Sequence, residues 1–277
     1  MRYYSLALLP FLLHACAPNV VDGKASGEIP VPGAVDRVEI VLEKGSISLH
    51  KSEDANVHWE AATRKGATAA ADLELLERVP MELRATQVGT TLRIEGPRVP
   101  VDLANRDPGA ALVLKLAIKV PKRVAAVLKT ERGPIGVKAW ETSVEAHTGA
   151  GDIRLEDVTG SAKTFTGSGN HQVTGQRGPI DLTTDHGNFL VYVDEIAPAG
   201  VSIFTKAGSI QCNLPKGVGF ALEAETKLGE VETVLDVERT KTETGGHRAK
   251  GAVHGGGPKV TLGSEIGSVT VREYERP

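Results

Sequence analysis

The sequence has 277 residues, with 32 Lys and Arg against 35 Asp and Glu, so its formal net charge is −3. This balance excludes the strongly basic surface typical of proteins that bind nucleic acid or anionic lipid, and we expect no nucleic-acid partner. Aromatic residues make up 4% of the chain while Gly reaches 31 residues, a composition that favours short β-strands with tight turns over a helical bundle.

The first sixteen residues predict export. Arg2 supplies one positive charge, and residues 5–13 form an apolar run that is shorter than the roughly 20 residues needed to span a bilayer. Leu13-His14-Ala15-Cys16 resembles the lipobox of bacterial lipoproteins, although His14 stands where a small residue is commoner. The resemblance implies that residues 1–15 are a signal peptide, cut after Ala15, and that Cys16 is diacylated. The alternative is an ordinary secretory signal in which Cys16 falls by chance.

The residue after the lipidated cysteine bears on the destination. In double-membrane bacteria an Asp there would favour retention at the inner membrane. Resemblance to that sorting rule, with Ala17 in place of Asp, implies an outer-membrane lipoprotein that faces the periplasm or the outside. Two acyl chains anchor a protein stably, whereas one holds it only marginally. Residues 16–34 are small and polar and contain Pro and Gly, so we predict a flexible tether between the lipid and the folded body.

Residues 35–130 predict a β-rich segment with one short helix. The helix is expected over 68–78, which is rich in Ala, Leu and Glu and ends before Pro80. Two strands, 38–42 and 46–50, are expected with a short connection between them. Further strands are predicted over 56–61, 91–95 and 112–120.

From Gly133 the sequence repeats with a period of nine residues. Six of the seven blocks between 133 and 193 open with Gly, and the third and fifth residues of the blocks are mostly apolar. Positions two apart share one face of a strand, so each block predicts a short strand with one apolar face, opened by a Gly turn. The third positions are Ile135, Val144, Ile153, Ala162, His171, Ile180 and Phe189, and the fifth are Val137, Ala146, Leu155, Thr164, Val173, Leu182 and Val191.

Two such blocks make one coil of about 18 residues with two facing strands. Stacked coils predict an all-β protein, in which a parallel two-sheet β-solenoid spans 131–277. Ile135, Ile153, His171 and Phe189 then form one interior column, and Val144, Ala162 and Ile180 form the facing one. Because His171 and Thr164 are polar, the middle coil is expected to be irregular. We expect the N-terminal strands to cap one end, residues 260–272 to cap the other, and the Gly-rich stretch 240–257 to be a mobile loop.

The start of the repeat carries a resemblance to a known family. Lys119-Val120-Pro121-Lys122 precedes strands that open with Gly, then Asp, Ser or Pro, then Ile, as in Gly151-Asp152-Ile153 and Gly208-Ser209-Ile210. In these motifs residues 35–273 resemble the β-strand-repeat family named "putative adhesin", whose function is not established and many of whose members are bacterial lipoproteins. The resemblance implies a β-solenoid-like body and brings no catalytic residues with it.

The sequence predicts no metal and no cofactor. No two His have the HxH or HExxH spacing of a metal site. Calcium-binding β-rolls share the nine-residue period, but their paired Gly and fixed Asp are missing here, and only Asp152 and Asp181 stand near the block starts. Calcium in the repeat turns stays an open alternative. Cys212 has no base beside it in the sequence and is interpreted as a strand residue, not as a nucleophile.

Two groups of polar residues in the repeat are candidate sites. A polysaccharide-cleaving enzyme needs paired acids in a groove, for which one face could supply Asp152, Glu156, Asp157, Asp181 and Asp185. We favour solvated charges on an outward strand face. A flat hydroxyl array for water or glycan would use Thr164, Thr166, Thr174, Thr183 and Thr184, which ordinary β-propensity explains equally well.

These observations predict no catalytic site. We expect a non-enzymatic, lipid-anchored cell-envelope protein, held in the membrane through Cys16, that presents a β-solenoid surface for adhesion or for interaction with an envelope protein or polysaccharide. The alternatives are an enzyme acting on envelope or extracellular polysaccharide, and an envelope stress sensor or scaffold. A groove with two carboxylates at catalytic separation would favour the enzyme.

Overall fold

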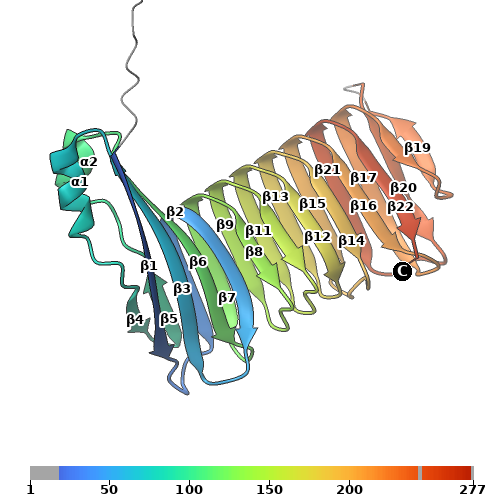
Figure 1. The fold of residues 1–277 in the computed structure, drawn as a ribbon. Coiled ribbons are helices and arrows are strands. Elements are labelled where there is room, and N and C mark those ends of the chain that lie inside the picture. The colour runs from blue at the N-terminus through green and yellow to red at the C-terminus, as the bar shows by residue number, and fades with distance from the viewer. Residues whose placement is uncertain (1–18, 243–244, 276–277) are drawn as a thin grey trace, which may run out of the picture.

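The protein folds into two long, facing β-sheets that run the length of the molecule (Figure 1). The computed structural model describes residues 19–242 and 245–275, so the predicted signal peptide and Cys16 lie outside the described residues. Within these ranges the chain forms 22 strands and two short helices. The prediction of an all-β, solenoid-like fold is therefore confirmed.

Sheet A begins with antiparallel strands and continues as a parallel stack. Its spatial order is β1 (Asn19–Pro30), β3 (Asn56–Ala67), β6 (Ala111–Pro121), the second half of β2 (Arg37–Ser52), β8 (Ile135–Lys138), β10 (Ile153–Glu156), β12 (His171–Gln176), β14 (Phe189–Val193), β16 (Ile210–Pro215), β22 (Val269–Tyr274) and β18 (Val231–Thr233).

Sheet B faces sheet A across the core. Its spatial order is β4 (Arg84–Val88), β5 (Thr91–Glu95), the first half of β2, β7 (Ala125–Arg132), β9 (Val144–Ala150), β11 (Ala162–Ser168), β13 (Ile180–His186), β15 (Val201–Ala207), β21 (Lys259–Ile266), β17 (Phe220–Leu228), β20 (His247–Val253) and β19 (Glu238–Lys241).

The two interior columns predicted from the repeat are confirmed. Ile135, Ile153, His171 and Phe189 are direct partners on successive strands of sheet A, and Ile210 and Val269 extend the column. Val144, Ala162 and Ile180 are partners in sheet B. The middle coil is also irregular, because the register between β12 and β14 shifts between Val173 and Gln176. One continuous hydrophobic core runs from Val31 to Val271, so residues 35–130 and 131–277 share it.

Glycines form a ladder along the corner where sheet B turns into sheet A. A Cβ at Gly151 would lie 2.2 Å from the carbonyl oxygen of Gly133, and one at Gly187 would lie 1.9 Å from that of Gly169. Both residues have φ of 155°, which favours glycine. The rungs in spatial order are Gly45, Gly133, Gly151, Gly169, Gly187, Gly208, Gly267 and Gly229. The repeat therefore requires Gly because each corner packs directly on the previous corner's backbone.

Buried hydroxyl groups hold this ladder from inside. Thr148 donates a hydrogen bond to the carbonyl oxygen of Gly133 at 3.0 Å, and Thr166 does the same to Gly151 at 3.1 Å. The same bond joins the hydroxyl groups of Thr130, Thr184, Thr205, Ser264 and Thr226 to the corner glycines. These hydroxyls satisfy carbonyl groups that the tight corner would otherwise leave without a partner.

One strand was predicted as two. Residues 38–42 and 46–50 belong to the single strand β2, which pairs with β7 in sheet B and with β6 in sheet A. Gly45 lies at the crossing point with φ of 141°. The prediction of a connecting turn was wrong because this glycine bends the strand through the corner without ending it.

The predicted tether is also wrong over most of its length. Residues 19–30 form β1, which pairs with β3 at every position from Asn19 to Pro30. A Cβ at Gly27 would lie 2.8 Å from the Trp59 ring, and one at Gly23 would lie 2.8 Å from the Met81 sulfur. The small residues that resembled a linker are needed because two large side chains pack against them.

The C-terminal end differs from the prediction in its order. The strands formed by 260–272 do not cap the stack, because β21 lies between β15 and β17 and β22 lies between β16 and β18. The outermost coil is β17 with β18, and antiparallel β20 and β19 cover its sheet B edge. The stretch 240–257 was predicted as a loop, but β20 occupies 247–253. At the other end β1 and β3 in sheet A and β4 in sheet B cap the stack, as expected of the N-terminal strands.

Two helices lie beside the N-terminal cap. The predicted helix is confirmed as α1 (Ala70–Glu77), and a second one, α2 (Val101–Arg106), was not predicted. They share a small apolar cluster that includes Leu76 and Leu103, and Arg106 forms an ion pair with Asp72. Among the described residues, neither helix has the length and apolar character needed to cross a membrane.

Candidate functional site

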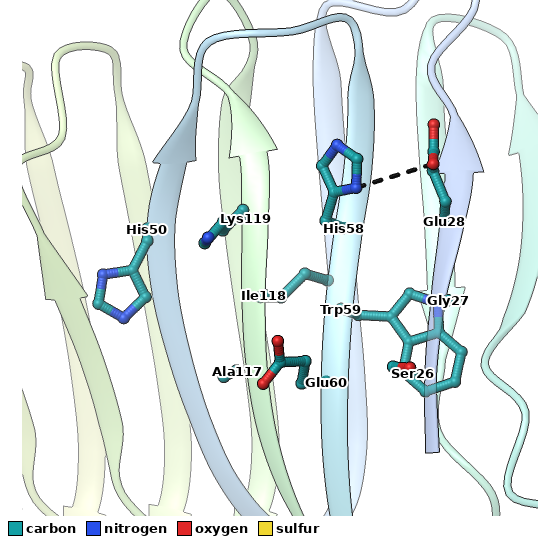
Figure 2. A pocket seen from close by; sticks show the side chains of 10 residues that line it. All are labelled: Ser26, Gly27, Glu28, His50, His58, Trp59, Glu60, Ala117, Ile118 and Lys119. Carbon is teal, nitrogen blue, oxygen red and sulfur yellow. Dashed lines mark ion pairs between the residues drawn. The ribbon is translucent and has the colours of Figure 1, made fainter.

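The outer face of sheet A at the N-terminal end is hollowed across four strands. Glu28 on β1, His58 on β3, Lys119 on β6 and His50 on β2 are successive partners in one row. Figure 2 shows these four side chains on adjacent strands, with the Trp59 ring beside Gly27. The hollow they line has a volume of about 570 Å³.

The neighbouring row gives this hollow a floor of mostly small side chains. Ser26, Glu60, Ala117 and Ser48 are partners across the same four strands. A second hollow of about 490 Å³ shares Ser26, Glu60 and Ala117 with the first and continues toward Lys24 and Lys115. Because outward residues alternate along a strand, small side chains in one row leave room between the larger ones of the rows beside it.

Polar contacts fix one side of this surface. His58 Nε2 lies 2.6 Å from Asp54 Oδ2, and His58 Nδ1 lies 3.9 Å from Glu28 Oε2. The pKa of Asp54 is held below its usual value by the backbone N–H of Asn56, then by hydrogen bonds with His58 and Ser52. The Asp54 carboxylate therefore stays ionised more readily than an ordinary Asp, and its contact with Nε2 orients the His58 imidazole.

Three lysines around the hollows have no carboxylate partner. Lys24 and Lys115 flank Ala62 on the strands at either side of it, and Lys119 lies two residues beyond Ala117. In the part of the chain that the structure describes, none of the three forms an ion pair or a side-chain hydrogen bond. Elsewhere many lysines are paired, as Lys129 is with Glu39 at 2.7 Å. The three ammonium groups outnumber the carboxylates of Glu28 and Glu60 that line the same hollows, so this end of sheet A carries a small excess of positive charge.

Two more hollows continue along sheet A beyond β2. One of about 370 Å³ contains Ser48, Gly136 and Gln172, and the next, of about 530 Å³, shares Gln172 and extends to Gln211 and Thr270. We call the four hollows together the sheet A trough. Its lining beyond β2 includes amide and hydroxyl side chains, which hydrogen-bond without carrying charge, together with the charged Asp152 and Arg154 and the apolar Leu190.

A ladder of side-chain hydrogen bonds forms the corner edge of the trough. Asp152 Oδ1 accepts the backbone N–H of Asn170 at 2.7 Å, and Asn170 Oδ1 accepts that of Asn188 at 2.9 Å. Asn188 Oδ1 in turn accepts the N–H of Ser209 at 2.8 Å. Asp152 therefore serves the corner of the repeat.

The five acidic residues considered for catalysis do not share a face. Glu156 lies on the outer face of sheet A and Asp152 at its corner, whereas Asp181 and Asp185 project from sheet B. Lys138, by hydrogen bond, and then the charges of Arg154 and Lys138 hold the pKa of Glu156 below its usual value. Asp157 occupies a turn with φ of 52°. The interpretation that these acids could line one groove is therefore wrong, because alternate half-coils place them on opposite sheets.

The remaining polar candidates are also structural. Thr164, Thr166 and Thr184 are buried, so they cannot form a surface array with Thr174 and Thr183. Burial raises the pKa of the Cys212 thiol to about 12, which agrees with an inert interior residue. Among residues 19–242 and 245–275, no three His, Cys, Asp or Glu side chains come together as metal ligands.

The N-terminal end of the trough was missed at the level of sequence because its residues come from β1, β3, β6 and β2, which are far apart in the chain. A signal was present in the alternation of each strand, as in Lys115, Ala117 and Lys119. Alternation marks the outward face of one strand, but the order of strands decides which outward faces meet.

The fold and the surface define a largely parallel β-solenoid with a polar trough on the outer face of sheet A. The sequence profile of the family described as Toastrack DUF4097 matches residues 118–272, more than half of the chain. The chain therefore belongs to the Toastrack DUF4097 family. No curated protein matches the sequence.

Solved structures from three bacteria are similar in part. A "putative cell adhesion protein" from Clostridium sporogenes has 12% identity and a TM-score of 0.33, over 93% of this chain and 100% of that one. A "putative adhesin" from Bacteroides fragilis has 10% identity and a TM-score of 0.40, over 91% and 97%. A "putative lipid binding protein" from Parabacteroides distasonis has 14% identity and a TM-score of 0.37, over 92% and 97%.

Proposed function

We propose that this chain is a non-enzymatic, lipid-anchored protein of the outer membrane that holds an envelope polysaccharide of acidic character along the sheet A trough. The observation that carries the proposal is the series of hollows along one sheet face, with unpaired Lys24, Lys115 and Lys119 at its N-terminal end. The corner ladder of Asp152, Asn170, Asn188 and Ser209 places a polar side chain at successive coils along the trough, which suits a repetitive polymer.

The lysines supply the first test. Replacing Lys24, Lys115 and Lys119 by Ala should weaken binding of soluble polygalacturonate at least about tenfold at low salt, because three charge contacts are lost. Added salt should weaken wild-type binding more steeply than that of the variant. Isothermal titration calorimetry over a range of salt concentrations measures both effects.

A matched control removes the same charge from the other sheet. Lys163, Lys206 and Lys227 project from sheet B, and their replacement by Ala should leave polygalacturonate binding unchanged. Equal losses in the two triple variants would show that only net charge matters, and the trough would not be the site.

A polysaccharide-cleaving enzyme is the second candidate because Glu28 and Glu60 both line the first hollow. Glu28 accepts a hydrogen bond from Asn56 and lies beside His58, which favours a role in holding the surface together. An assay for new reducing ends after incubation with polygalacturonate separates the two functions. If wild-type protein releases reducing ends and Glu60→Gln abolishes that release, the protein is a hydrolase and not a binding protein.

The anchor is tested at Cys16. Cys16→Ser should move the protein from the membrane pellet to the soluble fraction and abolish labelling by radioactive palmitate, while its circular dichroism stays that of a β protein. Only Ala17 and Pro18 separate Cys16 from β1, a reach of about 10 Å. The lipid therefore holds the start of β1, and with it the N-terminal end of the solenoid, near the bilayer. A wild-type protein that takes up no label, or a Cys16→Ser variant that stays in the pellet, removes the anchor from the proposal.

A further inference from the structure

Phenylalanine is scarce in this protein, and its placement is uneven. Of the four Phe in the described residues, Phe189 and Phe220 are buried in the core, while Phe165 and Phe204 are each 37% exposed. Single exposed apolar residues are ordinary on any protein surface. The informative feature is that both exposed rings project from the outer face of sheet B, the face opposite the trough.

The two rings lie in one row that follows the solenoid axis. Phe165 on β11 is the partner of Thr183 on β13, and Thr183 is the partner of Phe204 on β15. Neighbouring strands are about 4.8 Å apart, so the rings repeat at roughly 10 Å. We call the whole row the aromatic row, which consists of Lys129, His147, Phe165, Thr183, Phe204 and Gly263.

The Phe204 ring lies against the sheet. On the next strand, β21, its partner is Gly263, where an added Cβ would lie 3.0 Å from Phe204 Cδ2 and 3.5 Å from Cε2. The ring therefore leans over the space that a side chain at 263 would fill. The Cδ2–Cε2 edge of the ring therefore faces the backbone at Gly263, and the absence of a side chain there leaves the ring partly open to solvent.

The Phe165 ring borders a hollow of about 310 Å³ on the same face. Lys129, His147 and Gly149 line it from β7 and β9, and Arg98 reaches it from the connection after β5. An apolar ring thus lies in one recess with hydrogen-bond donors and with the acceptor carboxylates of Glu43 and Glu131. This combination fits the apolar C–H face and the hydroxyl rim of a sugar ring.

The charges along the section between the rings balance. Lys163 and Asp181 are partners on adjacent strands along one side of the row. On the other side Lys206 Nζ is paired with Asp185 Oδ1 at 2.7 Å. The section offers no net charge to an acidic polymer, in contrast to the lysine end of the trough.

We propose that the aromatic row binds a neutral polysaccharide that lies along the solenoid axis, with one sugar stacked on Phe165 in the hollow and another on Phe204. A second copy of this chain fits the surface less well, because a stable protein interface covers about 800 Å² on each partner around a continuous apolar core. Here two isolated rings are separated by Thr183 and bordered by charged side chains.

The test is affinity electrophoresis in native gels that contain soluble neutral polysaccharides, namely laminarin, mannan, xylan and dextran. Wild-type protein should be retarded by at least one of them. Phe165→Ala and Phe204→Ala should each weaken that binding about 5–10-fold, and the double variant should abolish retardation. Phe204→Trp should keep or strengthen it, because a larger flat ring is restored.

Leu228→Ala is the matched control, because Leu228 is 56% exposed on β17 of the same sheet and lies outside the row. It should bind as wild type does. The proposal is overturned if no neutral polysaccharide retards a folded wild-type protein, or if the double variant binds unchanged. It is also overturned if light scattering finds a wild-type dimer that the double variant converts to monomer, since a second copy would then occupy the row.

Discussion

Gly187→Ala should be among the most destabilising single substitutions in this protein, with a loss of about 3–5 kcal/mol in the free energy of unfolding. The new Cβ would lie 1.9 Å from the carbonyl oxygen of Gly169, and the backbone at Gly187 has φ of 155°. The backbone at Gly187 cannot shift to relieve this clash, because it is held on its other side. The Gly187 N–H donates to the carbonyl oxygen of Ala207 at 2.9 Å, and the next rung, Gly208, packs on the Gly187 carbonyl group. Urea unfolding followed by circular dichroism measures the loss.

The position of the clash predicts the shape of the unfolding curve as well. In a stack where each coil contacts only its neighbours, a broken corner weakens the interface between two coils. We expect the transition of Gly187→Ala to broaden or divide. Gly33→Ala is the control, because no atom lies within 4 Å of its added Cβ, and its stability should match that of wild type. Equal stability of Gly187→Ala and wild type would contradict the ladder as the reason for the glycine repeat.

His171 should make the fold sensitive to acid. The side chain is 1% exposed, its ring stacks on Phe189 at 4.5 Å, and neither ring nitrogen has a hydrogen-bond partner among the described residues. Burial lowers the pKa of His171 from 6.5 to about 4. Between pH 6.5 and pH 4, His171 is therefore protonated in the unfolded chain but neutral in the folded chain. His171 does not reduce the free energy of unfolding above pH 6.5, but reduces it as pH drops toward 4, by up to about 3 kcal/mol.

His171→Leu should remove that loss and leave the column apolar. We expect a gain of about 1–2 kcal/mol at pH 7, because two unpartnered polar atoms leave the core. The difference from wild type should widen between pH 6.5 and pH 4. Carboxylates with lowered pKa, such as Glu156, add their own loss near the acid end, but they are common to both proteins.

The measurement is urea unfolding at several pH values, with His186→Leu as the control, because His186 is exposed at the end of β13. That control should follow the wild-type pH profile. If His171→Leu and wild type show the same dependence of unfolding free energy on pH, burial of His171 does not make the fold sensitive to acid.

The sequence could predict only those features of the aromatic row that follow from the nine-residue period. The nine-residue period placed Ile135, Ile153 and Phe189 in one column because identical coils stack in register. The rings of Phe165 and Phe204 could be assigned to outward positions by the same alternation. Whether the two rings share one row depends on the extra residues between β14 and β15. These make that coil longer than the 18-residue repeat, and the period alone does not predict their number.

By itself the sequence determined the β class, the parallel repeat, the Gly-marked corners and the buried columns, because those depend on contacts between neighbouring coils that repeat every two blocks. The tertiary structure alone decided that residues 19–30 form a strand, that β2 continues through Gly45, and that β21 and β22 lie inside the stack. It also decided the sheet A trough, where Lys24 and Lys115 meet across β3. The reason is that strand order depends on contacts between residues far apart in the chain. The small residues of β1 resemble a linker in the sequence, and only the folded chain shows that they pair with β3 and pack against Trp59 and Met81.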